Sequence, residues 1–327
     1  MAIDILSLQP NVISKDLRGK YILLAGAPKV GKTAFCCQSD SALILATEIG
    51  TNAQAGAMVQ PIDSWSSFKL VLRQLDSKEA KEKFKTICID TVGIAFDLCE
   101  QFICQQNGVR KIGDIAYGGG YTLLSKEFES ALRKITMMGY GLLLTCHLKE
   151  SFDEEGKLIA AKPDLNNRCL KIVNGLVDVI AVITQTWNEK GESERWIRTR
   201  STPAITAGSR YKYLDELIPF GFHEFENALA RAIDKEAENG ANVVDSAPIY
   251  TGEKLDFDAI MAEARQIWTS LVEKASTDEE KTDVVRTLSK KAEMVFGHPV
   301  KLSEVTEDQV DLLNLVLIDF RDVASKR

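Results

Sequence analysis

The sequence predicts an α/β fold with a mainly parallel sheet, followed by a small all-α domain. Three observations lead to this prediction. Residues 26–33 match a phosphate-binding loop, and they lie between a short apolar run and a segment that can open a helix. Up to about residue 226, short apolar runs alternate with helical segments, as in parallel strands joined by helices. After residue 252, three helical patterns follow one another without strands.

The strands of the first part are recognised as short runs of apolar residues. They are expected over residues 21–25, 42–46, 84–90 and 141–147. Helices are expected over 33–37, from the N-cap Ser64 onward, over 92–105 and over 123–138. The charged run 78–85 is interpreted as the solvated end of the helix that begins at Ser64, and the glycine-rich run 107–120 as a loop. A hairpin over 151–159 and strands over 177–184 and 196–200 complete this part.

The phosphate-binding loop fits the pattern G-x-x-x-x-G-K-[ST] at every fixed position. A loop that turns from strand to helix directs backbone N–H groups inward, where they bind anions, and its glycines allow the tight bend. Lys32 would neutralise the β- and γ-phosphates of ATP, and the Thr33 hydroxyl would ligate Mg²⁺. The expected nucleotide contacts are Gly26, Ala27, Pro28, Lys29, Val30, Gly31, Lys32, Thr33 and Ala34.

Three further polar residues end apolar strands at the edge where ligands bind in a parallel sheet. Asp90 occupies the Walker B position and would hold Mg²⁺ through water, next to Thr33. Glu48, which we expect to end the strand beside the phosphate loop, would orient and deprotonate the attacking water. His147 would sense the γ-phosphate through a hydrogen bond; a strand-end histidine with a purely structural role is the alternative.

Composition and charge restrict the other functions that this chain can have. The 327 residues are 45% hydrophobic and 27% charged, and no apolar run is long enough for a membrane span. The net charge of −7 arises entirely in residues 227–327, so any DNA contact must come from local basic loops in the first part. Seven scattered cysteines without a C-x-x-C pair favour a reducing cytoplasm and no zinc site.

The expected domains are a core over residues 1–226, a linker over 227–252 and a helical domain over 253–327. Capping boxes begin helices at Thr277 and Thr306, with Glu280 and Gln309 as their third residues. Gly297, followed closely by a proline, predicts a helix end.

The order of these motifs resembles that of RecA-type ATPases. The nearer resemblance is to the phage RecA-like P-loop ATPases of single-strand annealing and recombination, and it covers about residues 18–225. It is carried by the phosphate loop, by Ile87-Cys88-Ile89-Asp90-Thr91 and by three short motifs: Glu48-Ile49-Gly50, Gly119-Gly120-Tyr121 and His147-Leu148-Lys149. The resemblance implies a RecA-like core, an ATPase that uses Mg²⁺ and is stimulated by DNA, and a role on single-stranded DNA in recombination, annealing or replication.

The resemblance also implies two DNA-facing loops, over residues 107–121 and 149–171. Basic side chains would follow the phosphate backbone and aromatic ones would stack on bases. The residues that it nominates are Arg110, Lys111, Tyr117, Tyr121, Lys157, Lys162 and Arg168. Ordinary surface loops are the alternative, and the acidic run 153–155 counts against the second loop.

Related ATPases carry a Lys-x-Arg motif that the neighbouring subunit's nucleotide contacts, and Arg210 fits its arginine. Gly208 occupies the place of the lysine, which puts the trans-acting role in doubt. The resemblance implies head-to-tail homo-oligomers and contact with a single-strand binding or recombination protein. The cysteine pattern predicts the cytoplasm, that of the host for a viral chain, and the lack of a long apolar run predicts no membrane contact.

Two other functions remain open from the sequence. The first is a nucleotide-dependent scaffold or loader whose acidic, helical C-terminal domain binds a partner protein. The second is a small-molecule kinase, which the absence of an arginine-rich lid motif disfavours. Binding to single-stranded DNA that weakens as salt rises would favour the DNA-dependent ATPase over the scaffold, because counterions released on binding make DNA affinity fall with salt.

Overall fold

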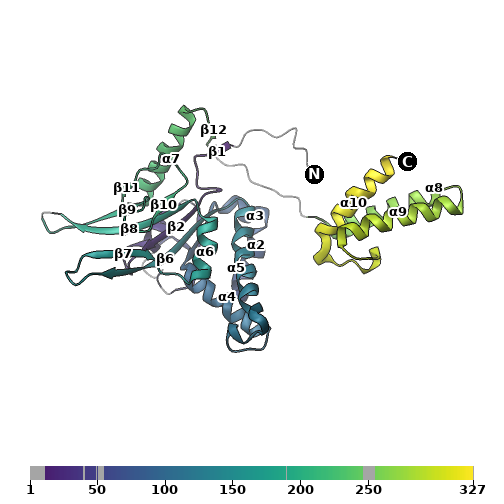
Figure 1. Ribbon diagram of the computed structural model, residues 1–327. Coiled ribbons are helices and arrows are strands. Elements are labelled where there is room, and N and C mark those ends of the chain that lie inside the picture. Colours follow the sequence, from purple (N-terminus) through teal and green to yellow (C-terminus); the bar gives the residue numbers. More distant parts are fainter. Residues whose placement is uncertain are drawn as a thin grey trace. The chain divides into compact units, whose positions relative to one another are not determined.

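The computed structural model separates the chain into two compact units that divide at residues 251 and 252 (Figure 1). The described residues are 12–39, 41–48, 50, 55–188, 190–245 and 255–326. The first unit is an α/β domain and the second is a bundle of helices. Each is described by itself.

The α/β unit contains strands and helices in alternation. Its strands are β1 (Val12–Ser14), β2 (Tyr21–Gly26), β3 (Ala42–Ala46), β4 (Met58–Pro61), β5 (Thr86–Asp90), β6 (Gly141–Phe152), β7 (Leu158–Pro163), β8 (Val179–Trp187), β9 (Ser193–Arg198), β10 (Gly208–Ser209), β11 (Leu217–Pro219) and β12 (Asn242–Val244). Its helices are α1 (Lys32–Cys37), α2 (Trp65–Leu75), α3 (Lys78–Lys83), α4 (Val92–Gln106), α5 (Gly119–Met137), α6 (Asn167–Leu176) and α7 (Phe222–Glu238), with short 3₁₀ turns η2 (Ile112–Asp114) and η3 (Ala116–Gly118).

One large sheet organises this unit, with the strand order β11-β9-β8-β2-β6-β5-β3-β4. Strands β8, β2, β6, β5, β3 and β4 are parallel, whereas β9, β10, β11 and β7 are added in antiparallel pairs. Strands β2 and β3 follow each other in the chain but are separated in the sheet by β6 and β5. The predicted α/β fold with a mainly parallel sheet is therefore confirmed.

Helices cover both faces of the sheet because its central strands are apolar on both sides. On one face, α2, α4, α5 and α6 bury a cluster that includes Phe68, Phe96 and Phe128. On the other face, α1 and α7 bury a second cluster around Phe35, Phe222 and Phe225. Burial on both faces explains why the strands read as nearly continuous apolar runs in the sequence.

Two antiparallel hairpins extend from the sheet, β6–β7 and β8–β9 (Figure 1). The predicted hairpin over 151–159 is confirmed, but β6 does not end at His147 as the sequence suggested. It continues to Phe152, because its second half pairs with β7 after its first half has paired with β2. His147 therefore lies within a strand, opposite Gly26 of β2.

Several predicted boundaries are wrong. Residues 78–83 are a separate helix, because Ser77 accepts a hydrogen bond from the Ala80 N–H and caps a new start. Helix α5 begins at Gly119, inside the predicted loop. The predicted linker over 227–252 is also wrong up to residue 244, since most of α7 and all of β12 lie in it.

The physical reason for α7 is a buried apolar stripe at helical spacing. Four apolar residues of α7 pack into the second cluster: Ala228, Leu229, Ala232 and Ile233. Acidic residues flank this stretch in the sequence and hid the apolar stripe. β12 then pairs in parallel with β1, so this segment belongs to the α/β unit.

The C-terminal unit consists of α8 (Phe257–Lys274), α9 (Asp278–Phe296) and α10 (Val310–Ser325), with short turns η4 (Leu302–Glu304) and η5 (Glu307–Gln309). Leu271, Leu288, Leu313 and Phe320 lie in its core. The capping boxes at Thr277 and Thr306 and the left-handed helix end at Gly297 are confirmed.

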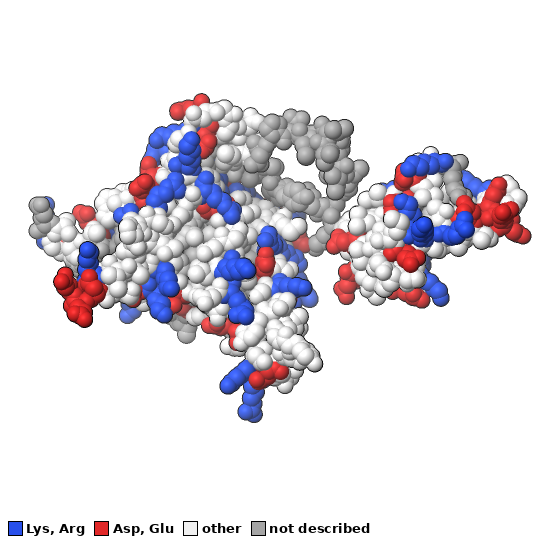
Figure 2. All heavy atoms as spheres, viewed as in Figure 1, with Lys and Arg blue, Asp and Glu red and all other residues white. Residues whose placement is uncertain are grey.

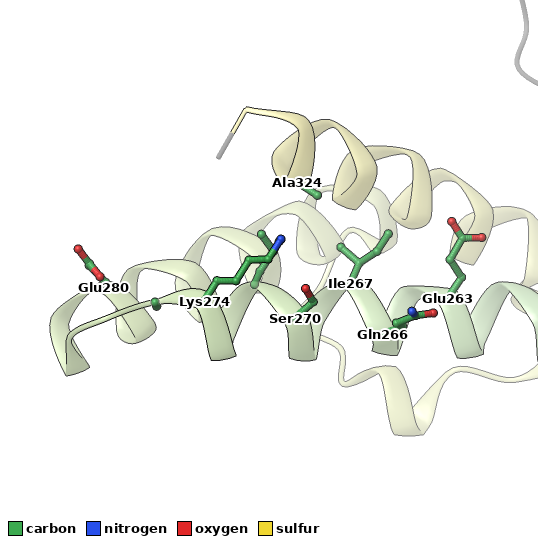
Figure 3. A pocket seen from close by; sticks show the side chains of 9 residues that line it. Glu263, Gln266, Ile267, Ser270, Lys274, Glu280 and Ala324 are labelled. Carbon is green, nitrogen blue, oxygen red and sulfur yellow. The ribbon is translucent and has the colours of Figure 1, made fainter.

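The C-terminal unit has a hollow of about 580 Å³, lined mainly by α8. Figure 3 shows the side chains that line it. Its lining mixes apolar and polar side chains, and one of its carboxylates, Glu263, is paired with Arg321 at 2.7 Å. In the part of the chain that the structure describes, no helix is both long and apolar enough to cross a membrane.

Candidate active site

The phosphate loop connects the end of β2 to α1, as the sequence predicted. Two of its positions require glycine. A Cβ on Gly26 would lie 2.8 Å from Val30 Cγ1, and Gly31 has a φ of 113° at the start of α1. Lys29 also has a positive φ, of 61°. The loop is therefore bent tightly at both ends, and its next residue, Lys32, is directed back into the bend.

Lys32 is almost fully buried, with 6% of its surface exposed. Its ammonium donates hydrogen bonds of 2.9 Å to the carbonyls of Gly26 and Ala27, and it lies 3.3 Å from His147 Nδ1. Burial lowers the pKa of Lys32, while the nearby carboxylate of Asp90 opposes this shift. The ammonium is thus held at the centre of the loop, where phosphate oxygens can replace the carbonyls as its acceptors.

Asp90 and Thr33 form the oxygen cluster expected for Mg²⁺. The Thr33 hydroxyl donates to Asp90 Oδ2 at 2.6 Å, and the Thr145 hydroxyl donates to Asp90 Oδ1. Carboxylate and hydroxyl oxygens are hard ligands that suit Mg²⁺, which usually takes one or two protein groups together with phosphates and water. No group of three or more acidic, histidine or cysteine side chains suited to a metal occurs among the described residues. Thr33 and Asp90 therefore fit an ion brought in with a nucleotide, whose charge it would neutralise.

Glu48 lies on the other side of His147 from Lys32. Its Oε1 accepts a 3.0 Å hydrogen bond from the Thr91 hydroxyl and lies 3.5 Å from His147 Nε2. Because an ammonium can only donate, Nδ1 of His147 accepts from Lys32, and a neutral ring then carries its proton on Nε2, toward Glu48. Lys32, His147 and Glu48 are thus linked in one polar chain.

The expected place of Glu48 in the sheet was wrong. β3 is not beside β2; β6 and β5 lie between them, and His147 on β6 bridges the gap. The grouping itself is as expected, because Lys32, Glu48, Asp90 and His147 all lie at or just beyond the carboxyl ends of parallel strands. A cavity of about 250 Å³ adjoins Glu48, Thr91 and His147 and provides space for water beside the carboxylate.

Sequence reasoning missed four residues of this site. Thr91 directly follows the end of a strand, which was an available signal, whereas Thr145 lies within β6. Thr47, also at a strand end, exchanges hydrogen bonds with the Thr91 backbone. Arg195 gave no signal, since it lies far along the chain from the loop, yet its Nη1 donates to Val30 O at 2.8 Å.

A family model described as AAA domain matches residues 18–211, more than half of the chain. The chain belongs to the AAA domain family. The matched stretch contains Lys32, Glu48, Asp90, His147 and Arg195. AAA domains are P-loop NTPases, so membership indicates that the chain binds and hydrolyses a nucleoside triphosphate, a reaction for which this family usually uses Mg²⁺.

The SPbeta prophage-derived uncharacterized protein YorG of Bacillus subtilis (strain 168) is 29% identical over 341 residues, and the whole of both chains is covered. The flagellar accessory protein FlaH from Methanocaldococcus jannaschii has a crystal structure that matches 62% of this chain and 85% of its own, with 11% identity and a TM-score of 0.34. The family confirms the predicted P-loop NTPase domain.

The residues nominated for DNA binding lie at two places. Arg110 and Lys111 are exposed in the turn between α4 and α5, and Tyr117, with a φ of 56°, is fully exposed in the same connection. Tyr121 lies in the first turn of α5 and is covered by the guanidinium of Arg168, 4.1 Å from its ring centre. This contact joins the two predicted loops.

The second predicted loop is largely a β-hairpin, because residues 148–152 pair with 158–163. Lys157 lies in its turn beside Asp153, Glu154 and Glu155, and Figure 2 shows the acidic cluster at the end of the β6–β7 hairpin. Lys162 is exposed on β7. Among the nominated residues of the second loop, Arg168 is therefore the one that contacts the first loop, through Tyr121.

Arg210 lies at the opposite end of the strands from the phosphate loop. It pairs with Asp178 at 3.0 Å, and Asp178 also accepts a hydrogen bond from the Tyr21 N–H at the start of β2. Because β2 rises about 17 Å from Tyr21 to Gly26, Arg210 cannot reach the nucleotide site of its own chain. Ile49, from the Glu48-Ile49-Gly50 motif, lies outside the described residues.

Proposed function

We propose that this protein is an ATPase that acts on single-stranded DNA in phage-type recombination, annealing or replication. The observation that carries the ATPase assignment is the polar chain from Lys32 through His147 to Glu48. This chain links the phosphate-binding ammonium of Lys32 to the carboxylate of Glu48, which can activate water. Thr33 and Asp90 supply the oxygen ligands for Mg²⁺.

In the proposed mechanism, ATP enters with its phosphates against the loop. Lys32 exchanges the carbonyls of Gly26 and Ala27 for phosphate oxygens. Glu48 accepts a proton from the attacking water, while the Thr91 hydroxyl fixes its orientation. His147, which contacts Lys32 on one side and Glu48 on the other, then senses the γ-phosphate through a hydrogen bond.

DNA binding is supported by the first predicted loop. Exposed Arg110 and Lys111 supply positive charge, and Tyr117 offers an aromatic ring without any cover. A fully exposed aromatic ring in the same connection as basic side chains suits stacking on an unpaired base. The Arg168–Tyr121 contact adds a guanidinium to the same neighbourhood. The prophage origin of YorG supports a phage setting, in the cytoplasm of the host.

The deciding experiment measures ATP hydrolysis with and without single-stranded DNA, over a range of salt concentrations. The proposal expects stimulation that declines as salt rises, because counterions compete for the phosphate backbone. Hydrolysis that is equal with and without DNA, together with no measurable DNA binding at low salt, would remove DNA from the function and leave the ATPase.

Replacing both Arg110 and Lys111 with alanine should weaken single-strand binding and flatten its salt dependence. Each lost phosphate contact reduces the slope of log K against log[salt] by roughly 0.7 for single strands. Hydrolysis without DNA should persist, because neither residue contacts the phosphate loop. Fluorescence anisotropy with a labelled oligonucleotide measures both quantities. A folded double variant with unchanged affinity and slope would exclude this turn as a DNA contact.

We further propose head-to-tail assembly in which Arg210 acts on the nucleotide of a neighbouring subunit. Heterologous interfaces use two different faces of one chain, and Arg210 lies at the opposite strand ends from the loop. Its side chain is 59% exposed, and its guanidinium would leave Asp178 to meet the neighbour's phosphates.

Arg210→Ala should then reduce hydrolysis far more than ATP binding, because an arginine finger stabilises charge that develops in the transition state. Arg231→Ala is the matched control, since Arg231 is 61% exposed and also paired with an aspartate. Mixing Arg210→Ala with Lys32→Ala should restore some activity at mixed interfaces. If the mixture stays inactive although mixed assembly is demonstrated, trans action is excluded.

The alternative of a scaffold or loader has one observation in its favour. Leu315 and Ile318, one helical turn apart on α10, are 52% and 51% exposed on an acidic helical unit. A partner protein with a basic, partly apolar surface would fit them. Protein capture that depends on Leu315 and Ile318, in the absence of any DNA binding, would favour this function.

A further inference from the structure

A planar cation lies directly against the phosphate loop, on the side away from Glu48. The guanidinium of Arg195 covers the ring of Phe220, 4.6 Å from the ring centre, and the Phe220 N–H donates to Arg195 O at 2.9 Å. Both side chains approach Gly31 closely. A Cβ there would lie 3.0 Å from Arg195 Nη1 and 3.1 Å from Phe220. Gly31 is thus required by its neighbours as well as by its φ.

Arg195 and Phe220 are held in this position by backbone and packing contacts. Arg195 Nη1 donates to Val30 O, and Phe220 lies 6.0 Å from Phe35 of α1, centre to centre. Arg195 is nevertheless an exposed residue. One face of its guanidinium lies on Phe220, so the opposite face is the one that can receive a ligand.

The sheet order decides which end of a nucleotide meets Arg195. β6 and β8 flank β2 on opposite sides, so His147 and Glu48 lie on one side of the phosphate loop and the β8–β9 hairpin on the other. Hydrolysis requires the γ-phosphate to lie near Glu48. With the triphosphate bound along the loop, the sugar and base extend toward β8, β9 and Phe220.

We propose that the nucleotide base stacks on the open face of the Arg195 guanidinium, with Phe220 backing it from the other side. Arg195 then selects nucleoside triphosphates over inorganic triphosphate, and Phe220 is a positioning residue. Guanidinium planes and aromatic rings stack on any base, so this surface gives affinity for nucleosides in general and little choice among bases. This inference rests on the proposed nucleotide site and adds its base-binding part.

The test compares the affinities of two ligands, ATP and inorganic triphosphate, each with Mg²⁺, by calorimetry. Arg195→Lys is the decisive variant, because lysine keeps the positive charge and can still donate to Val30 O but has no plane. ATP affinity should fall about tenfold, within the roughly 5- to 150-fold range of one stacking contact, and triphosphate affinity should not change. Phe220→Leu should show the same difference to a smaller degree. Arg133→Lys, an exposed arginine on α5, is the matched control.

Four results distinguish the possibilities. If Arg195→Lys lowers both affinities by the same factor, Arg195 only braces the loop and the inference is overturned. Unchanged ATP affinity in a folded Arg195→Lys variant overturns it as well. Lys32→Ala must lose affinity for both ligands. If it does, and Arg195→Lys binds both as the wild type does, the nucleotide site is supported and only the base contact is refuted. A wild-type protein that binds neither ligand would refute the nucleotide site and this inference together.

Discussion

Lys32→Ala is expected to abolish nucleotide binding at ordinary ATP concentrations. The buried ammonium supplies the cation at the centre of the phosphate loop, and its donors already point at the two carbonyls that phosphate oxygens would replace. A hydrogen bond to a charged group contributes roughly 1.5–3 kcal/mol. Losing two of them lowers affinity about 10²–10⁴-fold. Calorimetric titration with ATP and Mg²⁺ measures the loss.

The control for this variant is Lys15→Ala, which removes a lysine paired with Asp234 on the surface. It should bind ATP as the wild type does. Thermal unfolding of both variants shows whether the fold is retained. An Lys32→Ala protein that binds ATP normally would refute the assignment of the phosphate loop.

Glu48→Gln is expected to retain ATP and to hydrolyse it about 10²–10⁴-fold more slowly. Glutamine preserves the shape of the side chain and can still accept the hydrogen bond from the Thr91 hydroxyl, but its amide cannot take a proton from water. The contact with His147 also remains possible. Single-turnover hydrolysis and ATP affinity, measured separately, distinguish the chemical step from binding.

Glu129→Gln provides the matched change on the surface of α5, where Glu129 pairs with Arg133. Its turnover should equal that of the wild type. Should Glu48→Gln turn over at the normal rate, another group activates the water. A parallel loss of ATP affinity would instead assign Glu48 a role in binding.

The local sequence determined the phosphate loop, most of the strands around it and the caps of the C-terminal helices. These features depend on residues close together in the chain. Gly26, Gly31 and Lys32 act within one turn, and Ser64, Thr277 and Gly297 each act on the helix that they adjoin. The parallel sheet also followed from local patterns, since strands buried on both faces are apolar throughout.

Only the tertiary structure decided how these pieces combine. The sequence placed Glu48 beside the loop because β3 follows β2 in the chain, whereas the sheet inserts β6 and β5 and makes His147 the link between Glu48 and Lys32. Arg195 reached Val30 across the fold without any local signal. The limits of α7 were set by its packing into the second apolar cluster, whereas the end of β6 was set by its hairpin partner β7. Short-range propensity identifies a strand, a cap or a loop, but sheet order and side-chain neighbours arise from packing between segments far apart in the chain.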